Sequence, residues 1–346
     1  MANFLNRKYS HFVFAMVVVT AMLTIHASVA KSDDLDIDEV IERVFLERKK
    51  LYAGDVSVRG LKQVANFANQ EMTRNTRDIV ERFRFDYSQN HLFHEEELHN
   101  LSDKPTVNPL HRITILAASE GYVKSVEAST ISVSDVNTPM RALDLRAVGL
   151  SIYVDLMNSM NLAAYEKMIR RSHKEEKIEL ERLDQDGLVV LTVIHGDPLD
   201  QLKASNRRTR CWIDTGNGYT VVRLETQSLR KGDSPDKEES WRVPTITVST
   251  SWKPLNGTWV PLSTHTDLTV GIPDVSTSTF SFDLAFEWHS VNQDFREADY
   301  SIELLDVPRG SHCIIDGRGI RREKPVIVQH PNVDPLTLKR INTFNQ

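Results

Sequence analysis

Hydrophobic residues recur with helical spacing in three stretches of the chain and with strand spacing over much of the rest. From Leu35 to Tyr52 the apolar side chains fall close to one face and glutamates and arginines occupy the other, which predicts an amphipathic helix. The run from Pro139 to Met160 is apolar with few charges, so we expect a long helix there and a short second helix over Leu162–Arg171. Such helices would cover one face of a sheet.

Strand-like alternation starts after Gly54 and is strongest after Lys177. In the first half it predicts strands at 56–58, 82–87, 91–98, 122–126 and 130–133. In the second half it predicts hairpins that turn at Asp186–Gly187, Gly216–Gly218 and Asn256–Gly257, because these residues tolerate the positive φ of tight turns. We therefore expect residues 34–316 to form one α+β unit with a curved antiparallel sheet of about eight or more strands, in which sequence neighbours are neighbours in space.

One strand alternates more strictly than any other. Its large apolar side chains, which must all be shielded from water, are Phe280, Phe282, Leu284, Phe286 and Trp288. In a closed sandwich they would meet a second sheet, whereas in an open sheet they would meet helix side chains and a ligand. These five are our candidate ligand-binding residues, and we expect at least two of them to line a cavity under the Pro139–Met160 helix.

The first thirty residues have the three-part order of a secretory signal peptide. Arg7 and Lys8 precede an apolar run of 14 residues, Phe12–Ile25, and Ser28 and Ala30 are the small residues expected before a cut at Lys31. The run is shorter than the roughly 20 residues that span a bilayer as a helix, although an uncleaved anchor is the alternative. No cysteine lies near the cut for lipid attachment. We expect cleavage between Ala30 and Lys31 and a periplasmic or secreted protein.

Charge and composition narrow the class of partner. The chain carries 42 Lys and Arg against 48 Asp and Glu, and since Arg7 and Lys8 are the only charges before Lys31, the remainder has a net charge of −8. A mildly acidic, mixed surface gives no electrostatic reason to bind nucleic acid. Residues 317–346 are basic and contain several prolines, which predicts a flexible tail.

Two cysteines, Cys211 and Cys313, remain after export. In an oxidising compartment they could form a disulfide. Both lie among apolar neighbours, so two buried free thiols that pack as small hydrophobic groups explain them equally well.

Sequence patterns that suggest catalysis or metal binding fail on spacing. His94 and His99 are five apart and on a strand point to opposite faces, so they cannot share a zinc ion. The aspartates at 34, 36 and 38 lack the glycine and glutamate of a calcium loop and fit a helix start instead. Ser228–Lys231 has the spacing of a serine acyl-enzyme motif but follows a strand. We expect no catalytic residues, no metal and no cofactor.

The order of elements and several short motifs resemble the LolA-like superfamily of exported lipoprotein carriers, and within it a branch of uncharacterised proteins. The motifs are Cys211–Asp214, Gly218–Arg223, Trp252 with Asn256–Pro261, Trp288–Asn292, Tyr300–Ile302, Pro308–Gly310 and Ile315–Asp316. The resemblance implies an incomplete, strongly curved antiparallel β-barrel, a half-barrel closed by helices around an apolar cavity, over residues 31–316.

What the resemblance implies about function is binding and not catalysis. It favours an envelope protein that holds an acyl chain or a lipoprotein in the half-barrel. The alternative is a structural or regulatory envelope protein that binds a protein partner with the same fold. An exported hydrolase is the reading least supported, since the chain has no G-x-S-x-G motif and no phosphate-binding glycine loop. Fold alone does not decide among these functions.

Overall fold

The computed structural model describes residues 36–68, 71–101, 110–117, 120–125, 130–135, 144–150, 161–175, 177–183, 187–195, 207–229, 238, 241–272, 276–301, 304, 312–315 and 326–329. The chain divides into two compact units, Met1–Val40 and Ile41–Gln346. In the first unit only residues 36–40, at the start of helix α2, are described. The predicted signal peptide and its cut at Ala30–Lys31 lie outside the described residues.

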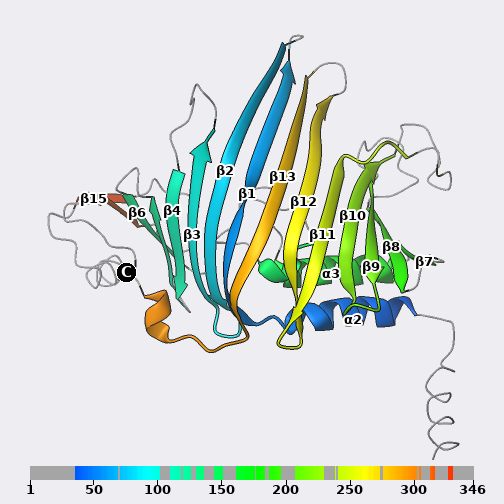
Figure 1. Ribbon diagram of the computed structural model, residues 1–346, viewed down its shortest axis with the longest axis horizontal. Coiled ribbons are helices and arrows are strands. Elements are labelled where there is room, and N and C mark those ends of the chain that lie inside the picture. The colour runs from blue at the N-terminus through cyan, green and yellow to red at the C-terminus, as the bar shows by residue number, and fades with distance from the viewer. Residues whose placement is uncertain are drawn as a thin grey trace, which may run out of the picture. The chain divides into compact units, whose positions relative to one another are not determined.

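The second unit is built around one sheet (Figure 1). A first run of strands comprises β1 (Ala53–Ala68), β2 (Glu71–Asp86), β3 (His91–Asn100), β4 (Leu110–Ala117), β5 (Glu120–Ser125) and β6 (Thr130–Asp135). A second run comprises β7 (Ile178–Arg182), β8 (Leu188–His195), β9 (Arg207–Asp214), β10 (Thr220–Ser228), β11 (Ile246–Leu255), β12 (Thr258–Ile272) and β13 (Ser276–Val291). Two short strands follow, β14 (His312–Ile315) and β15 (Val326–Gln329).

The two runs are meanders that join where the first strand meets the last. β1 pairs antiparallel with β13, from Gly54 opposite Val291 to Ala68 opposite Ser276. The strand order is β15-β14-β6-β5-β4-β3-β2-β1-β13-β12-β11-β10-β9-β8-β7, and within the described residues the terminal strands β15 and β7 do not pair, so the sheet is open. All pairs are antiparallel except β6 with β14. The predicted α+β class and antiparallel sheet are confirmed in this form.

The predicted hairpins of the second half are present. β7 pairs with β8, β9 with β10 and β11 with β12, and Gly187, Gly218 and Gly257 in their turns all have positive φ. In the predicted flexible tail, β15 is a strand paired with β14, and the rest of that tail lies outside the described residues.

Two of the three predicted helices are confirmed and the third is corrected. Helix α2 spans Ile37–Lys49 and helix α3 spans Leu162–Lys174. Asn161 caps the N-terminus of α3, because its side chain accepts a hydrogen bond from the Ala164 N–H. The described part of the predicted Pro139–Met160 helix, residues 144–150, is only a 3-10 turn. The 3-10 helix covers Leu145–Ala147 and ends at Val148, whose ψ of 133° is extended, and Gly149 then has φ +81°, a left-handed conformation that glycine adopts readily.

No helix among the described residues is long and apolar enough to cross a membrane.

Asn292 connects the C-terminal end of β13 to the segment that follows α2. Its φ of 55° is one that asparagine tolerates better than most residues. Its side chain accepts from the Tyr52 N–H at 3.1 Å and donates to the Lys50 carbonyl at 2.7 Å and the Thr258 hydroxyl at 3.0 Å. One residue thus joins α2, β12 and β13.

Candidate binding face of the sheet

Strand register places large apolar side chains on one face of the sheet, which we call the apolar face. One row across it runs from Cys211 through Leu224, Val248 and Thr266 to Phe282, each paired with the next. Its core contains buried residues from both meanders, including Val56, Val58, Ile79, Phe83, Phe85, Leu92, Val260, Phe282, Leu284, Phe286 and Val291. The opposite face is mostly polar.

The five residues singled out on β13 share the apolar face, as their alternation predicts. Phe282, Leu284 and Phe286 are buried, with Phe282 1% exposed, and Phe280 and Trp288 are half-buried against the same cluster. Trp288 donates from its indole nitrogen to the Pro261 carbonyl at 2.8 Å. The placement on one face is thus observed, and ligand binding by these residues stays a prediction.

Segments outside the sheet pack on this face. Leu145 and Val148, from the 3-10 turn and its end, belong to the same cluster as the β13 residues. Helix α3 reaches the face through Tyr165, whose hydroxyl lies 3.9 Å from the Cys211 sulfur. The rings of Tyr165 and Phe45 lie 6.3 Å apart and thereby join α3 to α2.

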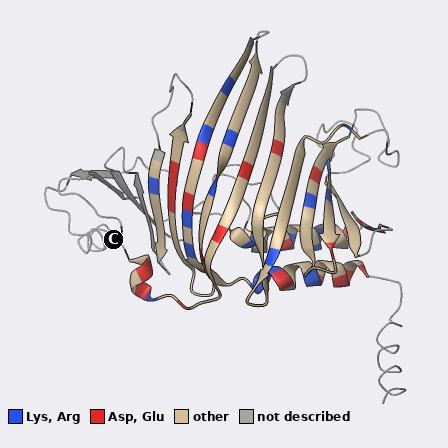
Figure 2. Ribbon diagram, in the orientation of Figure 1, with Lys and Arg blue, Asp and Glu red and all other residues tan. Residues whose placement is uncertain are grey.

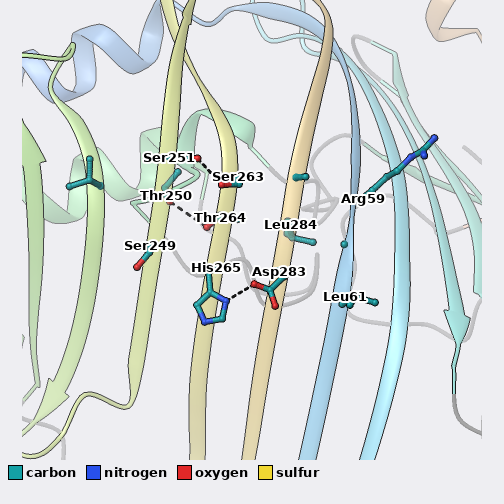
Figure 3. Close-up of a pocket in the computed structure, with 13 residues that line it drawn as sticks. Arg59, Leu61, Ser249, Thr250, Ser251, Ser263, Thr264, His265, Asp283 and Leu284 are labelled. Atoms are coloured by element: carbon teal, nitrogen blue, oxygen red, sulfur yellow. Dashed lines mark hydrogen bonds and ion pairs between the residues drawn. The ribbon is translucent and has the colours of Figure 1, made fainter.

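A cavity of about 600 Å³ is lined by residues of β1 and β10–β13 (Figure 3). Both faces of the sheet contribute to its lining. The apolar face supplies Gly60, Val222, Thr250, Thr264 and Leu284, and the opposite face supplies Arg59, Leu61, Ser249, Ser251, Ser263, His265, Asp283 and Ala285. Gly60 is required here because a Cβ would lie 1.8 Å from the Asp283 carbonyl oxygen and 2.8 Å from Leu284 Cδ2. The glycine therefore lets β13 approach and leaves Leu284 lying over the β1 backbone.

A second cavity of about 460 Å³ lies further along the same strands. The apolar face supplies Val64 of β1, Asn75 of β2, Leu268 of β12 and Phe280 of β13 to its lining. The opposite face supplies Gln63, Ala65, Arg74, Thr76, Asp267, Thr269, Thr279 and Ser281. Leu284 therefore lines one cavity and Phe280 the other. Both cavities fall within the range of about 300–1,000 Å³ that is typical of small-molecule sites.

Arg48 of α2 is a cation at the edge of this face. Its guanidinium lies 3.7 Å from the ring centroid of Trp252, which packs against the apolar cluster. The residue is 4% exposed, and among the described residues its Nε and Nη2 have no hydrogen-bond partner. Burial lowers the pKa of Arg48 to about 9, opposed in part by the nearby charge of Glu47.

Four charged or titratable side chains on the apolar face of β2–β4 form what we call the buried polar cluster: Glu81, His94, Glu96 and Arg112. His94 Nε2 lies 3.1 Å from Glu81 Oε2, and Arg112 Nη2 donates to Glu96 Oε2 at 2.5 Å. The His94 ring stacks on Phe83 with centroids 4.2 Å apart. Burial raises the pKa of Glu96, and the Arg112 charge opposes that shift. Sequence analysis did not find this cluster.

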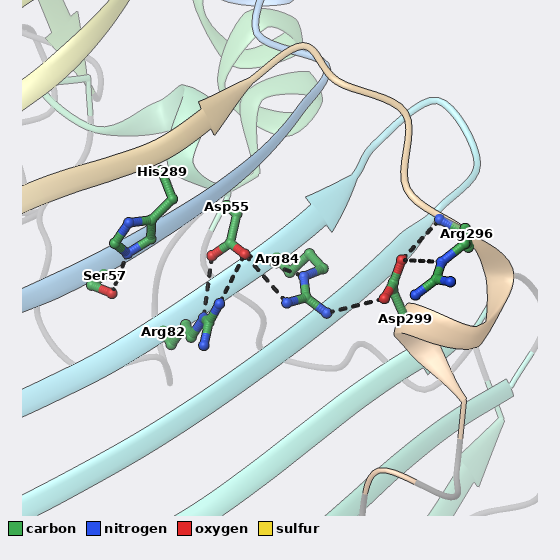
Figure 4. Close-up of polar contacts among 7 residues, drawn as sticks. All are labelled: Asp55, Ser57, Arg82, Arg84, His289, Arg296 and Asp299. Atoms are coloured by element: carbon green, nitrogen blue, oxygen red, sulfur yellow. Dashed lines mark hydrogen bonds and ion pairs between the residues drawn. The ribbon is translucent and has the colours of Figure 1, made fainter.

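Charged residues recur along the strands of the sheet (Figure 2), and several on the opposite face form ion pairs between strands. Asp55 accepts from Arg82 at 3.1 Å and from Arg84 at 3.3 Å, and Arg84 continues to Asp299 at 3.5 Å (Figure 4). Asp299 lies in the 3-10 turn Glu297–Tyr300, so the network fixes that turn to β1 and β2.

The structure bears out the reasoning on His94 and His99, since His94 is buried on the apolar face and His99 is exposed beside Glu97. A different group of side chains on the opposite face of β3 and β4 could hold a metal ion, and the sequence spacing gave no sign of it. There the ligand atoms of Glu95, Glu97 and His111 all lie within 4.8 Å of one another, and His111 Nε2 is 2.9 Å from Glu95 Oε1. These side chains could hold a cation, and ion pairing between them accounts equally for their positions.

Cys211 is buried and has no disulfide partner among the described residues. The side chain of Cys313 lies outside them, so neither alternative for the two cysteines, a disulfide or two buried free thiols, is tested. Burial raises the pKa of the Cys211 thiol to about 12, while its contact with Tyr165 lowers it in part.

We expect Cys211 to resist thiol reagents until the protein unfolds. With the pKa at about 12, only about one thiol in 10,000 is thiolate at pH 8. A Cys313→Ala variant treated with a chromogenic disulfide reagent at pH 8 should be labelled only when guanidinium is added. Rapid labelling of the folded variant would contradict the buried position of Cys211.

Comparison with known proteins returns structures and no sequence relatives. No family model matches the chain, and no curated protein matches it. Among solved structures, the chain is similar to a DUF1329 family protein from Desulfovibrio piger (10% identity, 78% of this chain and 98% of that one, TM-score 0.39). It is also similar to a putative outer membrane lipoprotein-sorting protein domain from Vibrio parahaemolyticus (12%, 78% and 99%, 0.37) and a LolA superfamily protein from Nitrosomonas europaea (9%, 78% and 100%, 0.32). The LolA-like resemblance seen in the sequence thus recurs among these structures, but TM-scores below 0.5 describe a partial likeness, from which no binding property follows.

Proposed function

We propose that this protein is an exported binding protein that holds an apolar chain, such as the acyl chain of a lipid or lipoprotein, on the apolar face. The observation that carries the proposal is the apolar face itself, with one cavity beside Leu284 and another beside Phe280 along β1, β12 and β13. Cavities of this size beside apolar strands suit a flexible hydrocarbon, because the ligand gains from leaving water and needs few directional contacts.

The length of the strands supports an extended ligand. β1, β2 and β13 each have 16 residues, which at about 3.3 Å per residue span roughly 50 Å. We propose that the sheet curls about this face as a half-barrel, with α3 and residues 144–150 over it. That arrangement would keep a large apolar surface out of water and away from aggregation.

The proposed place of action is the periplasm or the cell exterior, reached by the signal peptide that the first 30 residues indicate. Binding there, without catalysis, is the whole of the proposed activity. A protein partner on the same face is the alternative, and it would leave the purified protein free of lipid.

A half-barrel carrier should lose its ligand when Phe280 is replaced by asparagine. Phe280 is half-buried and lines the second cavity, so Phe280→Asn places an amide where the chain would lie without removing a fully buried side chain. The expected result is at least a tenfold loss of bound lipid per protein, measured by mass spectrometry of extracts.

Glu287→Asn is the matched control, because it places the same amide elsewhere on β13. Glu287 is exposed, points to the opposite face and lines neither cavity. This variant should carry as much lipid as the wild type. Equal lipid in both variants, with circular dichroism showing that both are folded, would contradict the proposed binding face.

A further inference from the structure

Arg48 carries a positive charge that is buried away from water, and within the described residues its Nε and Nη2 have no hydrogen-bond acceptor. Removing a charged group from water costs several kcal/mol unless a partner compensates it, so a buried guanidinium without hydrogen-bond acceptors is rare in native proteins. A site that is occupied in use accounts for such a group, because the ligand then supplies the missing acceptor.

Neighbouring carboxylates do not serve as that partner. Glu47, the adjacent residue of α2, accepts from Lys50 at 2.6 Å. Glu166 of α3 pairs with Lys49 at 2.7 Å and with Arg170 at 2.9 Å. These two acidic side chains, one from each helix, therefore already pair with other cations.

The positive charge of Arg48 lies beside the proposed binding face. Its guanidinium lies over Trp252, and the Trp252 indole is fixed by donation to the Val221 carbonyl at 2.9 Å. A Cβ on Gly149 would meet Trp252 at 3.0 Å and the Thr250 hydroxyl at 3.4 Å, so these groups are packed together. Thr250 lines the larger cavity. Trp252, Gly149 and Thr250 thus lie between the Arg48 guanidinium and the larger cavity.

We infer that Arg48 binds the anionic head group, a carboxylate or a phosphate, of the chain held on the apolar face. The planar guanidinium presents Nε and Nη2 side by side, which is the geometry that holds two oxygens of either group. The ligand is then an amphiphilic acid with a single charged end. This inference rests on the proposed function and adds the class of ligand to it.

The test compares three probes of equal chain length: palmitate, hexadecyl phosphate and hexadecanol. Each is titrated into the full-length protein after lipid extraction, with displacement of an environment-sensitive fluorescent dye as the signal. A charge-assisted hydrogen bond predicts that the wild type prefers an acid to the alcohol by about 10- to 100-fold. The stronger of palmitate and hexadecyl phosphate identifies the head group as carboxylate or phosphate.

Arg48→Met should abolish that preference while hexadecanol binds as before, because methionine keeps the apolar contact with Trp252. Lys49→Met is the matched control: it removes one positive charge from the next residue, which is half-exposed and paired with Glu166, and should keep the preference. Without ligand, Arg48→Met should melt no lower than the wild type, since it removes an uncompensated charge.

Two results would overturn the inference. Equal affinity of the wild type for acid and alcohol, or an unchanged preference in Arg48→Met, would exclude Arg48 as the head-group site and leave the proposed function standing. Failure of all three probes to displace the dye from the wild type would instead overturn the proposed function and the inference with it.

Discussion

Replacing Phe282 by aspartate is expected to lower the free energy of unfolding by about 5 kcal/mol, enough to unfold much of the protein at 25 °C. Phe282 is 1% exposed at the centre of the apolar face, where it packs within the cluster that joins the two meanders. The change removes a large apolar side chain and buries a carboxylate, whose cost the Lys62 amino group, 5.1 Å from the Phe282 ring centroid, offsets only in part. Urea denaturation followed by circular dichroism measures the loss.

The control for this change is Ala285→Asp, three residues along the same strand. Ala285 is exposed and lies on the opposite face, opposite Ser263 of β12. A carboxylate there should change the stability by no more than about 0.5 kcal/mol. A Phe282→Asp protein that stays folded and still carries lipid would contradict both the packing and the proposed binding face.

Replacing Arg112 by methionine is expected to lower the free energy of unfolding by about 3 kcal/mol at pH 8 and by much less at pH 4.5. Arg112 is the cation that faces Glu96, whose side chain is 3% exposed, so the variant leaves a buried carboxylate without its partner. Burial already raises the pKa of Glu96. Because the folded state then holds its proton more tightly than the unfolded state, stability is lost as the pH rises above the ordinary range of a glutamate.

The double variant Glu96→Gln with Arg112→Met isolates this carboxylate from Glu81 and His94, which remain in the buried polar cluster. It should recover most of the stability at pH 8 and lose the extra pH dependence of the single variant. Denaturation curves at pH 4.5 and pH 8 provide the comparison. An equal loss in Arg112→Met at both pH values would show that Glu96 is not the group responsible.

The second meander could be predicted from sequence because its signals are local. Turn residues such as Asn256 and Gly257 stand between alternating segments, and each hairpin pairs neighbours in the chain. The strict alternation of Phe280, Phe282 and Leu284 likewise fixed their common face.

The first meander was predicted only in part because its strands carry polar residues on both faces. β4 was missed, and β1 and β2 extend well beyond the segments predicted for them, through residues such as Gln63, Asn66 and Arg74. Pairing with neighbouring strands holds these stretches, and sequence alternation does not reveal such pairing. The long-range pair β1–β13 has no local signal at all.

The helix predicted over Pro139–Met160 shows the opposite error. Apolar residues such as Leu145 and Val148 have a composition that suits a helix, yet they pack as an irregular cover whose course is set by Gly149. Tertiary packing overrides helical propensity in such a segment.

The polar features of the apolar face were beyond prediction for a related reason. Arg48 fits the charged side of an amphipathic helix, and Glu81, His94 and Glu96 fit a solvated strand. Their burial follows from the register of β2 with β3 and from the packing of α2, which arise only when distant segments meet.

The central claim, that the apolar face holds an apolar chain, is tested most directly by native mass spectrometry of the protein purified from its exporting cells without detergent. The account predicts an adduct whose mass, after extraction, is that of a lipid with at least one long acyl chain, and its loss in Phe280→Asn but not in Glu287→Asn. A wild-type protein at its bare mass, which also fails to take up palmitate, hexadecyl phosphate or hexadecanol, would contradict it.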